Sequence, residues 1–281
     1  MQMARSNTEL ILVDAHSHLR DCFGVSRFLS EAHCNFRGVR IQGGHSTPPV
    51  GVLCLTTTSS ERGFDRLLDS VYRGNTKSES AFGQETLFKT QEPTSFCFAL
   101  GEEAILIAIA GRQLVSRDGL EILAIGTRQD FEGGQPIEKL LVEVASAGAI
   151  PVVPWGVGKW LGRRGRRVEA VIQNPNLPPF FLGDSGNRPA FWPQPSQFKM
   201  AEERGIRNLP GSDPLPFPEE VQRVGSVGVA LEGDLDLETP TQDLKERLLD
   251  PSTTFRPFGQ RETPLRFVRN QFKMQLRKLT Q

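Results

Sequence analysis

Two histidines, His16 and His18, follow directly on an apolar run at residues 10–13. If this run is a β-strand, side chains two residues apart project to the same side, so both imidazole rings face one point. Neutral imidazole is the commonest metal ligand in proteins. The spacing therefore predicts that the two rings share one metal ion. A pair of hydrogen-bonded histidines without a metal is the alternative.

Seven short apolar runs indicate the strands of the fold. They are rich in Val, Ile and Leu, as buried strands are, and cover residues 10–13, 50–55, 104–110, 120–125, 149–153, 180–182 and 227–231. Helical spacing at residues 61–72, 136–147 and 161–172 favours alternating strands and helices in a parallel α/β sheet or barrel. The turn sequence Arg-Asp-Gly at 117–119 separates the third run from the fourth, so these two runs are expected to form a hairpin.

Two long stretches are predicted to be irregular. Residues 174–195 contain six prolines, which is too many for a long helix and predicts a loop around one short strand. Residues 23–49 are likewise predicted to form a loop. Loops of this length inside a compact domain usually carry function or move.

Three segments resemble the polymerase and histidinol phosphatase (PHP) family of metal-dependent phosphoesterases. They read Asp-Ala-His-Ser-His at 14–18, Gly-Ala-Ile-Pro-Val-Val-Pro at 148–154 and Gly-Ser-Asp-Pro at 211–214. The resemblance covers about residues 10–231 and implies a distorted, TIM-like (β/α)7 barrel with a C-terminal helical appendage. It also implies that Asp213 is a metal ligand. The amidohydrolases share the opening His-x-His and a late aspartate, and they are the nearest alternative.

Several ligands that are usual in the PHP family are missing. All four histidines lie within the first 45 residues. The Thr-Asp-His of the family reads Leu-Thr-Thr-Thr-Ser at 55–59, and its Ala-His-Pro reads Val-Pro-Trp-Gly at 153–156. Gln113 stands where the family has a glutamate. A trinuclear metal site is therefore not expected.

The remaining set is His16, His18 and Asp213, with Asp184 as a further ligand or a base, because Asp184 also follows an apolar run. Three protein ligands and a water suffice for one catalytic zinc or manganese ion, and such an ion activates water. We therefore expect one or two divalent ions. Purely local roles are the alternatives, namely a helix cap for Asp213 and a turn for Asp184.

Basic residues follow other predicted strands, namely Arg128, Lys159 and Arg188. Activity in a barrel is found at the carboxyl ends of its strands, so we expect these three side chains to hold a phosphate group. Residues 156–167 add backbone amides, a helix start and further cations, which together could also bind phosphate. This stretch is not a Walker A loop, because Trp160 follows Lys159. An ordinary solvated helix surface is the alternative.

The composition excludes several classes of protein. The 33 Lys and Arg balance the 33 Asp and Glu, and 38% of the 281 residues are hydrophobic, which is typical of a globular protein without a bulk electrostatic partner. No apolar stretch approaches the length of a membrane span, and the polar residues 1–9 are no secretory signal. We expect a cytoplasmic protein whose four cysteines are reduced. Serine-hydrolase, dinucleotide-binding and zinc-finger motifs are missing from the sequence.

The sequence pattern changes near residue 231. Acidic residues follow, and we place a boundary between a barrel domain at 1–235 and an acidic linker with a helix at 236–281. The predicted helix begins at Thr263 and Pro264 and has Leu265, Val268, Phe272, Leu276 and Leu279 at helical spacing. We expect its apolar face to dock on the body. A basic arm for nucleic acid or acidic lipid is the alternative.

These observations support three hypotheses. The first is a PHP-like hydrolase that acts on a small phosphorylated substrate through metal-activated water. The second is a catalytically degenerate barrel that binds a phosphorylated ligand or partner in a regulatory role. The third, a nucleic-acid module built on the C-terminal helix, is disfavoured because the overall charge is balanced and no stacking motif accompanies the arginines. A membrane partner is not expected, and the sequence does not define an oligomeric state.

Overall fold

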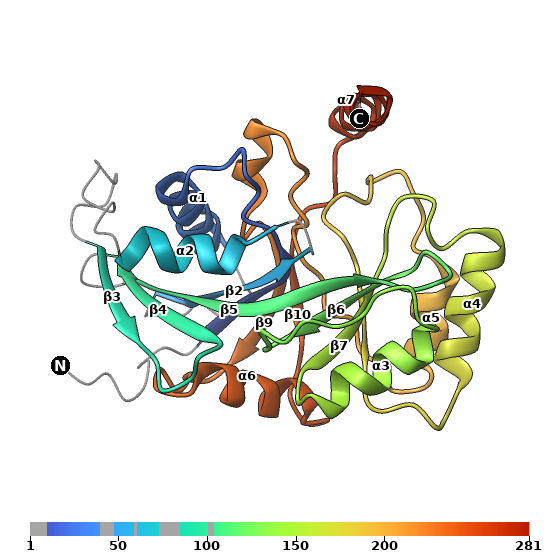
Figure 1. Ribbon diagram of the computed structural model, residues 1–281, viewed down its shortest axis with the longest axis horizontal. Helices are drawn as coiled ribbons and strands as arrows, with labels where there is room; N and C mark the ends of the chain where they lie inside the picture. The colour runs from blue at the N-terminus through green and yellow to red at the C-terminus, as the bar shows by residue number, and fades with distance from the viewer. Residues whose placement is uncertain (1–9, 40–47, 59–60, 73–84, 101–103, 281) are drawn as a thin grey trace.

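The computed structural model describes residues 10–39, 48–58, 61–72, 85–100 and 104–280. Its centre is one curled sheet of ten strands (Figure 1). Eight of them follow one another in the order β10-β9-β1-β2-β5-β6-β7-β8, and β3 and β4 extend the sheet beside β5. The strands are β1 (Leu10–Ser17), β2 (Val50–Thr57), β3 (Glu85–Lys89), β4 (Ser95–Leu100), β5 (Ala104–Val115), β6 (Glu121–Ile125), β7 (Ile150–Pro154), β8 (Phe181–Gly183), β9 (Val227–Glu232) and β10 (Arg256–Gly259).

Each predicted strand is confirmed, and so is the predicted hairpin. β5 and β6 pair in antiparallel fashion, whereas β1 with β2, β2 with β5, and β7 with β8 pair in parallel. The sheet is therefore mixed. The hairpin follows from its local sequence, because Gly119 takes the positive φ of 72° that its turn requires and that glycine adopts without steric cost.

The predicted TIM-like barrel is confirmed only in part, because the sheet is curled but open and forms a half-barrel. β9 occupies the free edge of β1 in antiparallel fashion and β10 continues beyond it, so β8 does not pair with β1. Residues 208–213 bridge this gap instead. The amide of Leu209 donates to Leu182 O at 2.7 Å, and the amide of Ala15 donates to Pro210 O at 3.3 Å. This segment brings the Gly-Ser-Asp sequence beside the end of β1.

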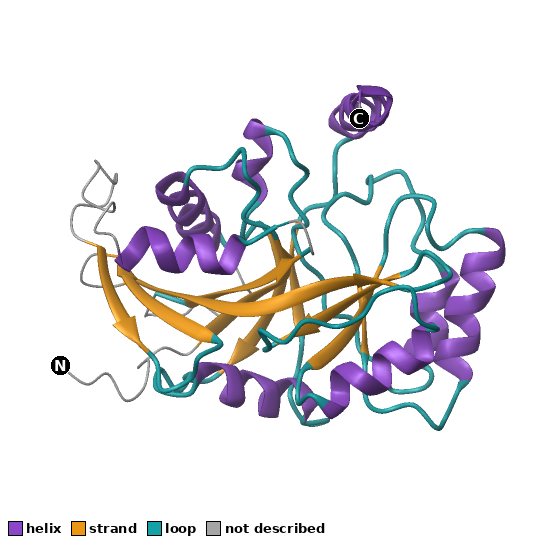
Figure 2. Ribbon diagram, viewed as in Figure 1, coloured by secondary structure: helices purple, strands orange, loops and turns teal. Residues whose placement is uncertain are grey.

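Helices cover the outer surface of the curled sheet (Figure 2). One apolar core lies beneath α1 and α2 and another beneath α3, α4 and α5, while the concave interior is filled by strand residues and by Leu244 and Leu248 of α6. The helices are α1 (Val25–Gly38), α2 (Gly63–Tyr72), α3 (Ile137–Ser146), α4 (Gly162–Gln173), α5 (Ser196–Glu202), the 3-10 helix η2 (Pro218–Arg223), α6 (Pro240–Leu249) and α7 (Pro264–Thr280).

The prediction that residues 23–49 are irregular is wrong over α1. Phe28, Leu29, Ala32 and Phe36 form a buried stripe at helical spacing on this helix. The start of the helix carries no local signal, because Gly24 is its N-cap, no side chain caps it and no acidic residue lies in its first turn. The burial of the apolar stripe stabilises the helix without these aids.

The sheet and its interior core extend beyond the predicted boundary at residue 235. β10 pairs with β9 across residues 256–259, and Leu244 and Leu248 of α6 are buried in the same core as β1 and β2. Within the described parts of the chain, no helix combines the length and the apolar character needed to cross a bilayer.

Helix α7 is confirmed, but the face that it presents to the body differs from the prediction. The helix stands at the edge of the molecule (Figure 1). Its apolar residues point outward, since Leu265 is 84%, Phe272 65% and Leu279 83% exposed. Its polar residues contact the body, because Glu220 is fully buried and accepts hydrogen bonds from Arg266 at 3.0 Å and from Asn270 at 3.1 Å. A buried carboxylate requires such donors, and this requirement sets the orientation of the helix. The ring of Phe267 adds apolar contacts with Phe191 and Trp192.

Candidate metal centre

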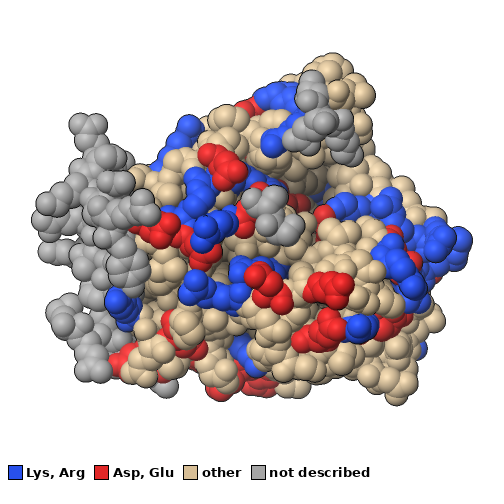
Figure 3. All heavy atoms as spheres, in the orientation of Figure 1, with Lys and Arg blue, Asp and Glu red and all other residues tan. Residues whose placement is uncertain are grey.

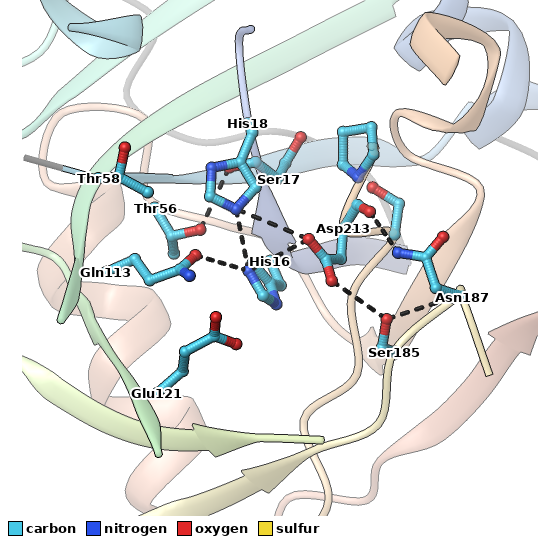
Figure 4. Close-up of polar contacts among 12 residues, drawn as sticks. His16, Ser17, His18, Thr56, Thr58, Gln113, Glu121, Ser185, Asn187 and Asp213 are labelled. Atoms are coloured by element: carbon cyan, nitrogen blue, oxygen red, sulfur yellow. Dashed lines mark hydrogen bonds and ion pairs between the residues drawn. The ribbon is translucent and has the colours of Figure 1, made fainter. Parts of the chain in front are cut away.

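The two histidine rings meet at the carboxyl end of β1, and both are buried (Figure 4). Their Nε2 atoms lie 3.0 Å apart, and the ring planes are tilted by 58°. Two ring nitrogens this close cannot both present a lone pair to empty space without repulsion, so a proton or a metal ion must lie between them. The predicted convergence of the rings is what the structure shows.

Asp213 reaches the same point from the segment that bridges β8 and β1. Its Oδ1 lies 3.6 Å from Nε2 of His16 and 3.7 Å from Nε2 of His18. Among the described residues, these three form the group whose ligand atoms all lie within 4.8 Å of one another. Two imidazole nitrogens and a carboxylate oxygen suit zinc or manganese. The three side chains could therefore hold a metal ion.

The backbone of Asp213 is held in an uncommon conformation. Its φ of 46° is the only positive value outside glycine among the described residues, and residues other than glycine adopt this region mainly where the surroundings impose it. The amide of Asp213 donates to His16 O at 2.7 Å, and Asn187 Nδ2 donates to Asp213 O at 2.6 Å. Ser185 Oγ also donates to the carboxylate of Asp213 at 3.3 Å. These contacts fix the carboxylate beside the histidines.

The second nitrogen of His18 is fixed by Glu61. Nδ1 lies 3.2 Å from Glu61 Oε2. Burial lowers the pKa of His18 to about 4, and the charge of Arg20 acts in the same direction, so the ring is neutral at pH 7. The neutral ring donates its Nδ1 hydrogen to the carboxylate and directs the lone pair of Nε2 toward Asp213 and His16. A carboxylate in this role orients a metal ligand and raises its basicity.

Arg20 completes the support of His18. It donates to Glu61 Oε1 at 2.6 Å and, through Nε, to Pro214 O at 3.0 Å. Burial acts to raise the pKa of Glu61, but the hydrogen bond from His18 and the charge of Arg20 outweigh it and the pKa falls to about 2. Burial also acts to raise the pKa of Asp213, yet the neighbouring imidazoles, Arg20 and Lys159 hold it below its usual range. Both carboxylates are therefore ionised at neutral pH.

Replacing Glu61 by alanine is expected to weaken zinc or manganese binding about 10–100-fold, the usual effect of removing such a supporting group. The reason is that His18 loses the acceptor that fixes its tautomer. The measurement is a competition titration against a chromophoric chelator. The control is Glu31→Ala, which removes a carboxylate that pairs with Arg27 on α1 at 3.4 Å. Equal affinities in the two variants would contradict this role of Glu61.

Asp14 organises the site from beneath. Its buried carboxylate accepts hydrogen bonds from the backbone amides of His16, Ser212 and Gly225 at 3.2, 2.9 and 2.9 Å and from Ser212 Oγ at 2.6 Å. The group therefore joins β1 to the segment that carries Asp213. Burial raises its pKa to about 6, against the opposing effect of these hydrogen bonds.

Gly211 is required by the close approach of two backbones. A Cβ atom at this position would lie 2.2 Å from the backbone nitrogen of His16 and 2.5 Å from its Cβ. Gly211→Ala must displace β1 or the bridging segment, and we expect it to cost about 2–4 kcal/mol of stability. Urea denaturation checks this value. In the control Gly38→Ala, where no atom lies within 4 Å of the added Cβ, we expect a change below about 0.5 kcal/mol.

Gln113 places an amide oxygen at the site. Its Oε1 lies 3.2 Å from Nε2 of His16, at the carboxyl end of β5. This is the position at which the family resemblance leads one to expect a glutamate. The neutral amide can coordinate or hydrogen bond but adds no negative charge, so the site has fewer anionic ligands than a PHP centre with the full ligand set.

The remaining predicted site residues are engaged in ion pairs. The carboxylate of Asp184 accepts hydrogen bonds from Arg188 Nε at 2.8 Å and from Arg188 Nη2. The Arg188 side chain is fully buried. Arg128 donates to Asp65 at 3.0 Å and is 43% exposed. Lys159 pairs with Glu121. The charge of Lys159 acts on Asp213, whereas Asp184 and Arg188 pair with each other and Arg128 pairs with Asp65.

Glu61, Arg20 and the organising role of Asp14 were not anticipated from the sequence. A signal existed for Arg20, because it continues the alternation of His16 and His18 by two residues. Glu61 lies 43 residues from His18 in the sequence, and no local pattern links these two positions.

Comparison with known proteins gives a likeness of fold. No family model matches the chain, and no curated protein matches it. PsfC from Pseudomonas syringae PB-5123 is similar in structure, with a TM-score of 0.54 and 14% identity over 95% of this chain and 98% of that chain. The lesion-specific endonuclease PfuEndoQ from Pyrococcus furiosus has a TM-score of 0.52 and 11% identity over 88% of this chain and 57% of that chain. These neighbours support a PHP-like fold.

Proposed function

We propose that this protein is a metal-dependent hydrolase of phosphoesters. The observation that supports this proposal is the convergence of His16, His18 and Asp213 within 4.8 Å of one another. A divalent ion, when bound there, supplies a Lewis acid that lowers the pKa of water to about 7. The PfuEndoQ neighbour is named as an endonuclease, an activity that breaks phosphodiester bonds, and this name favours a phosphoester over other substrates.

The residues of the chain divide the work as follows. His16 and His18 would hold a divalent ion through Nε2, and Asp213 would contribute a negative charge as well as an oxygen ligand. Glu61 orients His18, and burial together with the charge of Arg20 keeps the ring neutral. Of the three cations predicted to hold phosphate, we assign this role to Lys159, because its charge acts on Asp213. Its ammonium group could exchange its ion pair with Glu121 for one with a phosphate oxygen.

Hydrolysis of bis(p-nitrophenyl) phosphate and p-nitrophenyl phosphate with added Mn²⁺ or Zn²⁺ tests this function. We expect activity that EDTA removes and that Asp213→Asn lowers at least about 100-fold, because the variant loses an anionic ligand. The matched control is Asp21→Asn, whose side chain is 83% exposed and which should retain the wild-type rate. Activity that is equal with and without EDTA would contradict the proposal.

A regulatory, non-catalytic protein that binds a phosphorylated ligand is the second candidate. It is favoured by Gln113, which gives His16 a neutral neighbour where the family resemblance leads one to expect a carboxylate. Stoichiometric metal without hydrolysis of either ester would support this candidate over the first.

A further inference from the structure

A pocket lined by arginines lies between the β5–β6 turn and the start of α4. Its volume is about 780 Å³, and Arg117, Asp118, Arg163, Arg164, Arg166 and Arg167 line it together with Ala170. Figure 3 shows basic side chains gathered at the edge of the molecule where α4 lies. The residues come from two parts of the sequence that the fold brings together.

The acidic groups in and beside this pocket do not balance its cations. Arg167 pairs with Asp118 at 3.4 Å and with Glu138 at 2.6 Å, and Arg163 lies 3.9 Å from the same Asp118. Among the described residues, no acidic side chain forms an ion pair with Arg117 or Arg166. Five guanidinium groups therefore meet two carboxylates, which leaves an excess of three positive charges.

The position of these cations on α4 opposes the helix dipole. Arg163, Arg164, Arg166 and Arg167 lie in the first two turns, no acidic residue lies in the first turn, and no side chain caps the helix. Cations are favourable at the carboxyl end of a helix and unfavourable at its amino end. Repulsion among the arginines adds to this cost. A bound anion would offset both effects.

The pocket has the size and chemistry for a compact phosphorylated ligand. Small-molecule sites usually have volumes of about 300–1,000 Å³. Guanidinium groups bind phosphate oxygens in a bidentate manner. A diphosphate group carries roughly two to three negative charges at pH 7, which is close to the excess of three in the pocket.

We propose that this arginine pocket binds a diphosphate group, that is, two adjacent phosphates of a small molecule. The pocket shares no residue with the candidate metal centre. A short stretch of sequence links the two sites. Arg164 donates to Gly158 O at 3.0 Å. The residue after Gly158 is Lys159, which pairs with Glu121 and whose charge acts on Asp213. Binding here requires no metal ion, so it goes beyond the proposed hydrolysis and does not depend on it.

Calorimetric titration with sodium pyrophosphate at low ionic strength tests the proposal. We expect binding by the wild-type chain, and an affinity at least tenfold lower in Arg117→Ala/Arg163→Ala/Arg166→Ala. These three side chains are exposed, so their removal should leave the fold intact. The control Arg27→Ala/Arg204→Ala/Arg269→Ala removes the same charge from other exposed positions and should bind like the wild type.

Two further titrations distinguish the arginine pocket from the metal centre and from a nucleic-acid site. Pyrophosphate should bind equally well to a His16→Ala/His18→Ala variant, because the metal centre takes no part. Loss of binding in that variant, or equal binding by the two triple-arginine variants, would overturn the proposal. Binding of a single-stranded ten-nucleotide DNA at least tenfold tighter than pyrophosphate, and dependent on the same three arginines, would also overturn it in favour of a nucleic-acid site.

Discussion

The double variant His16→Ala/His18→Ala is expected to lose stoichiometric metal. The wild-type chain offers two imidazole nitrogens 3.0 Å apart and one carboxylate oxygen within 3.7 Å of both. Removal of the two nitrogens leaves Asp213 as the one member of the group. A single carboxylate competes poorly with water for a divalent ion, so we expect the affinity to fall by about a thousandfold or more.

Elemental analysis of protein purified without chelator measures this effect directly. The wild type should contain at least about one divalent ion per chain, and the double variant should contain almost none. His33→Gln is the matched control, because His33 is also buried but lies on α1 as part of another face of the fold. It should retain the metal content of the wild type.

An absence of metal in the wild type would remove the hydrolase proposal. The two histidines would then share a proton in a purely structural hydrogen bond, which is the alternative that their spacing leaves open. Thermal unfolding with and without added Zn²⁺ provides an independent readout, because a ligand that binds only the folded state raises its stability. The wild type should be stabilised and the double variant should not.

Replacing Asp14 by alanine is expected to be among the most destabilising single substitutions in the chain. Four donors lose their acceptor, namely three backbone amides and the hydroxyl of Ser212. Each buried donor left without a partner costs about 1–3 kcal/mol. Relaxation of the surroundings lowers the total, and we expect a loss of about 4 kcal/mol or more, a large share of the usual stability of about 5–15 kcal/mol.

Urea denaturation in the presence of EDTA measures this loss free of any contribution from metal. Asp21→Ala is the control, since its carboxylate is 83% exposed, and it should change stability by less than about 0.5 kcal/mol. A loss below about 1 kcal/mol in Asp14→Ala would show that the hydrogen bonds to this carboxylate do not hold the site together.

The same residue predicts a pH dependence of definite sign. Burial raises the pKa of Asp14 to about 6 from 3.8, so between these values the folded protein binds a proton that the unfolded chain has released. Stability from this group is therefore greatest below about pH 4 and declines as the pH rises through 6. The full difference is about 3 kcal/mol.

Other groups titrate in this range, so the effect of Asp14 is isolated as a difference. The pKa of His18 is lowered to about 4, and its contribution to stability is lost as the pH falls below 6.5, opposite in sign to that of Asp14. The free energy of unfolding of the wild type minus that of Asp14→Asn should fall by about 2.4 kcal/mol between pH 4 and pH 7. A difference that is constant with pH would show that Asp14 does not titrate in this range.

Local sequence accounts for seven of the ten strands and for the candidate metal ligands. Apolar runs in the sequence indicate the strands. The two-residue period of a strand predicts that the two histidine rings face the same point. Both signals arise between residues that are neighbours in the chain. Asp213 became identifiable through a short motif whose glycine is required by the contact with His16. These strands and candidate ligands could be predicted because the signals lie in neighbouring residues of the sequence.

Only the tertiary structure decided which charges meet. Asp184 and Arg188 follow one predicted strand, and they form an ion pair with each other. Glu61 orients His18 although the two are 43 residues apart. β9 pairs with the edge of β1, so the expected barrel is open. The buried Glu220 accepts hydrogen bonds from α7, so a polar face of this helix contacts the body. Electrostatic partners are chosen by proximity in space, and proximity depends on the packing of the whole chain rather than on periodicity within one segment.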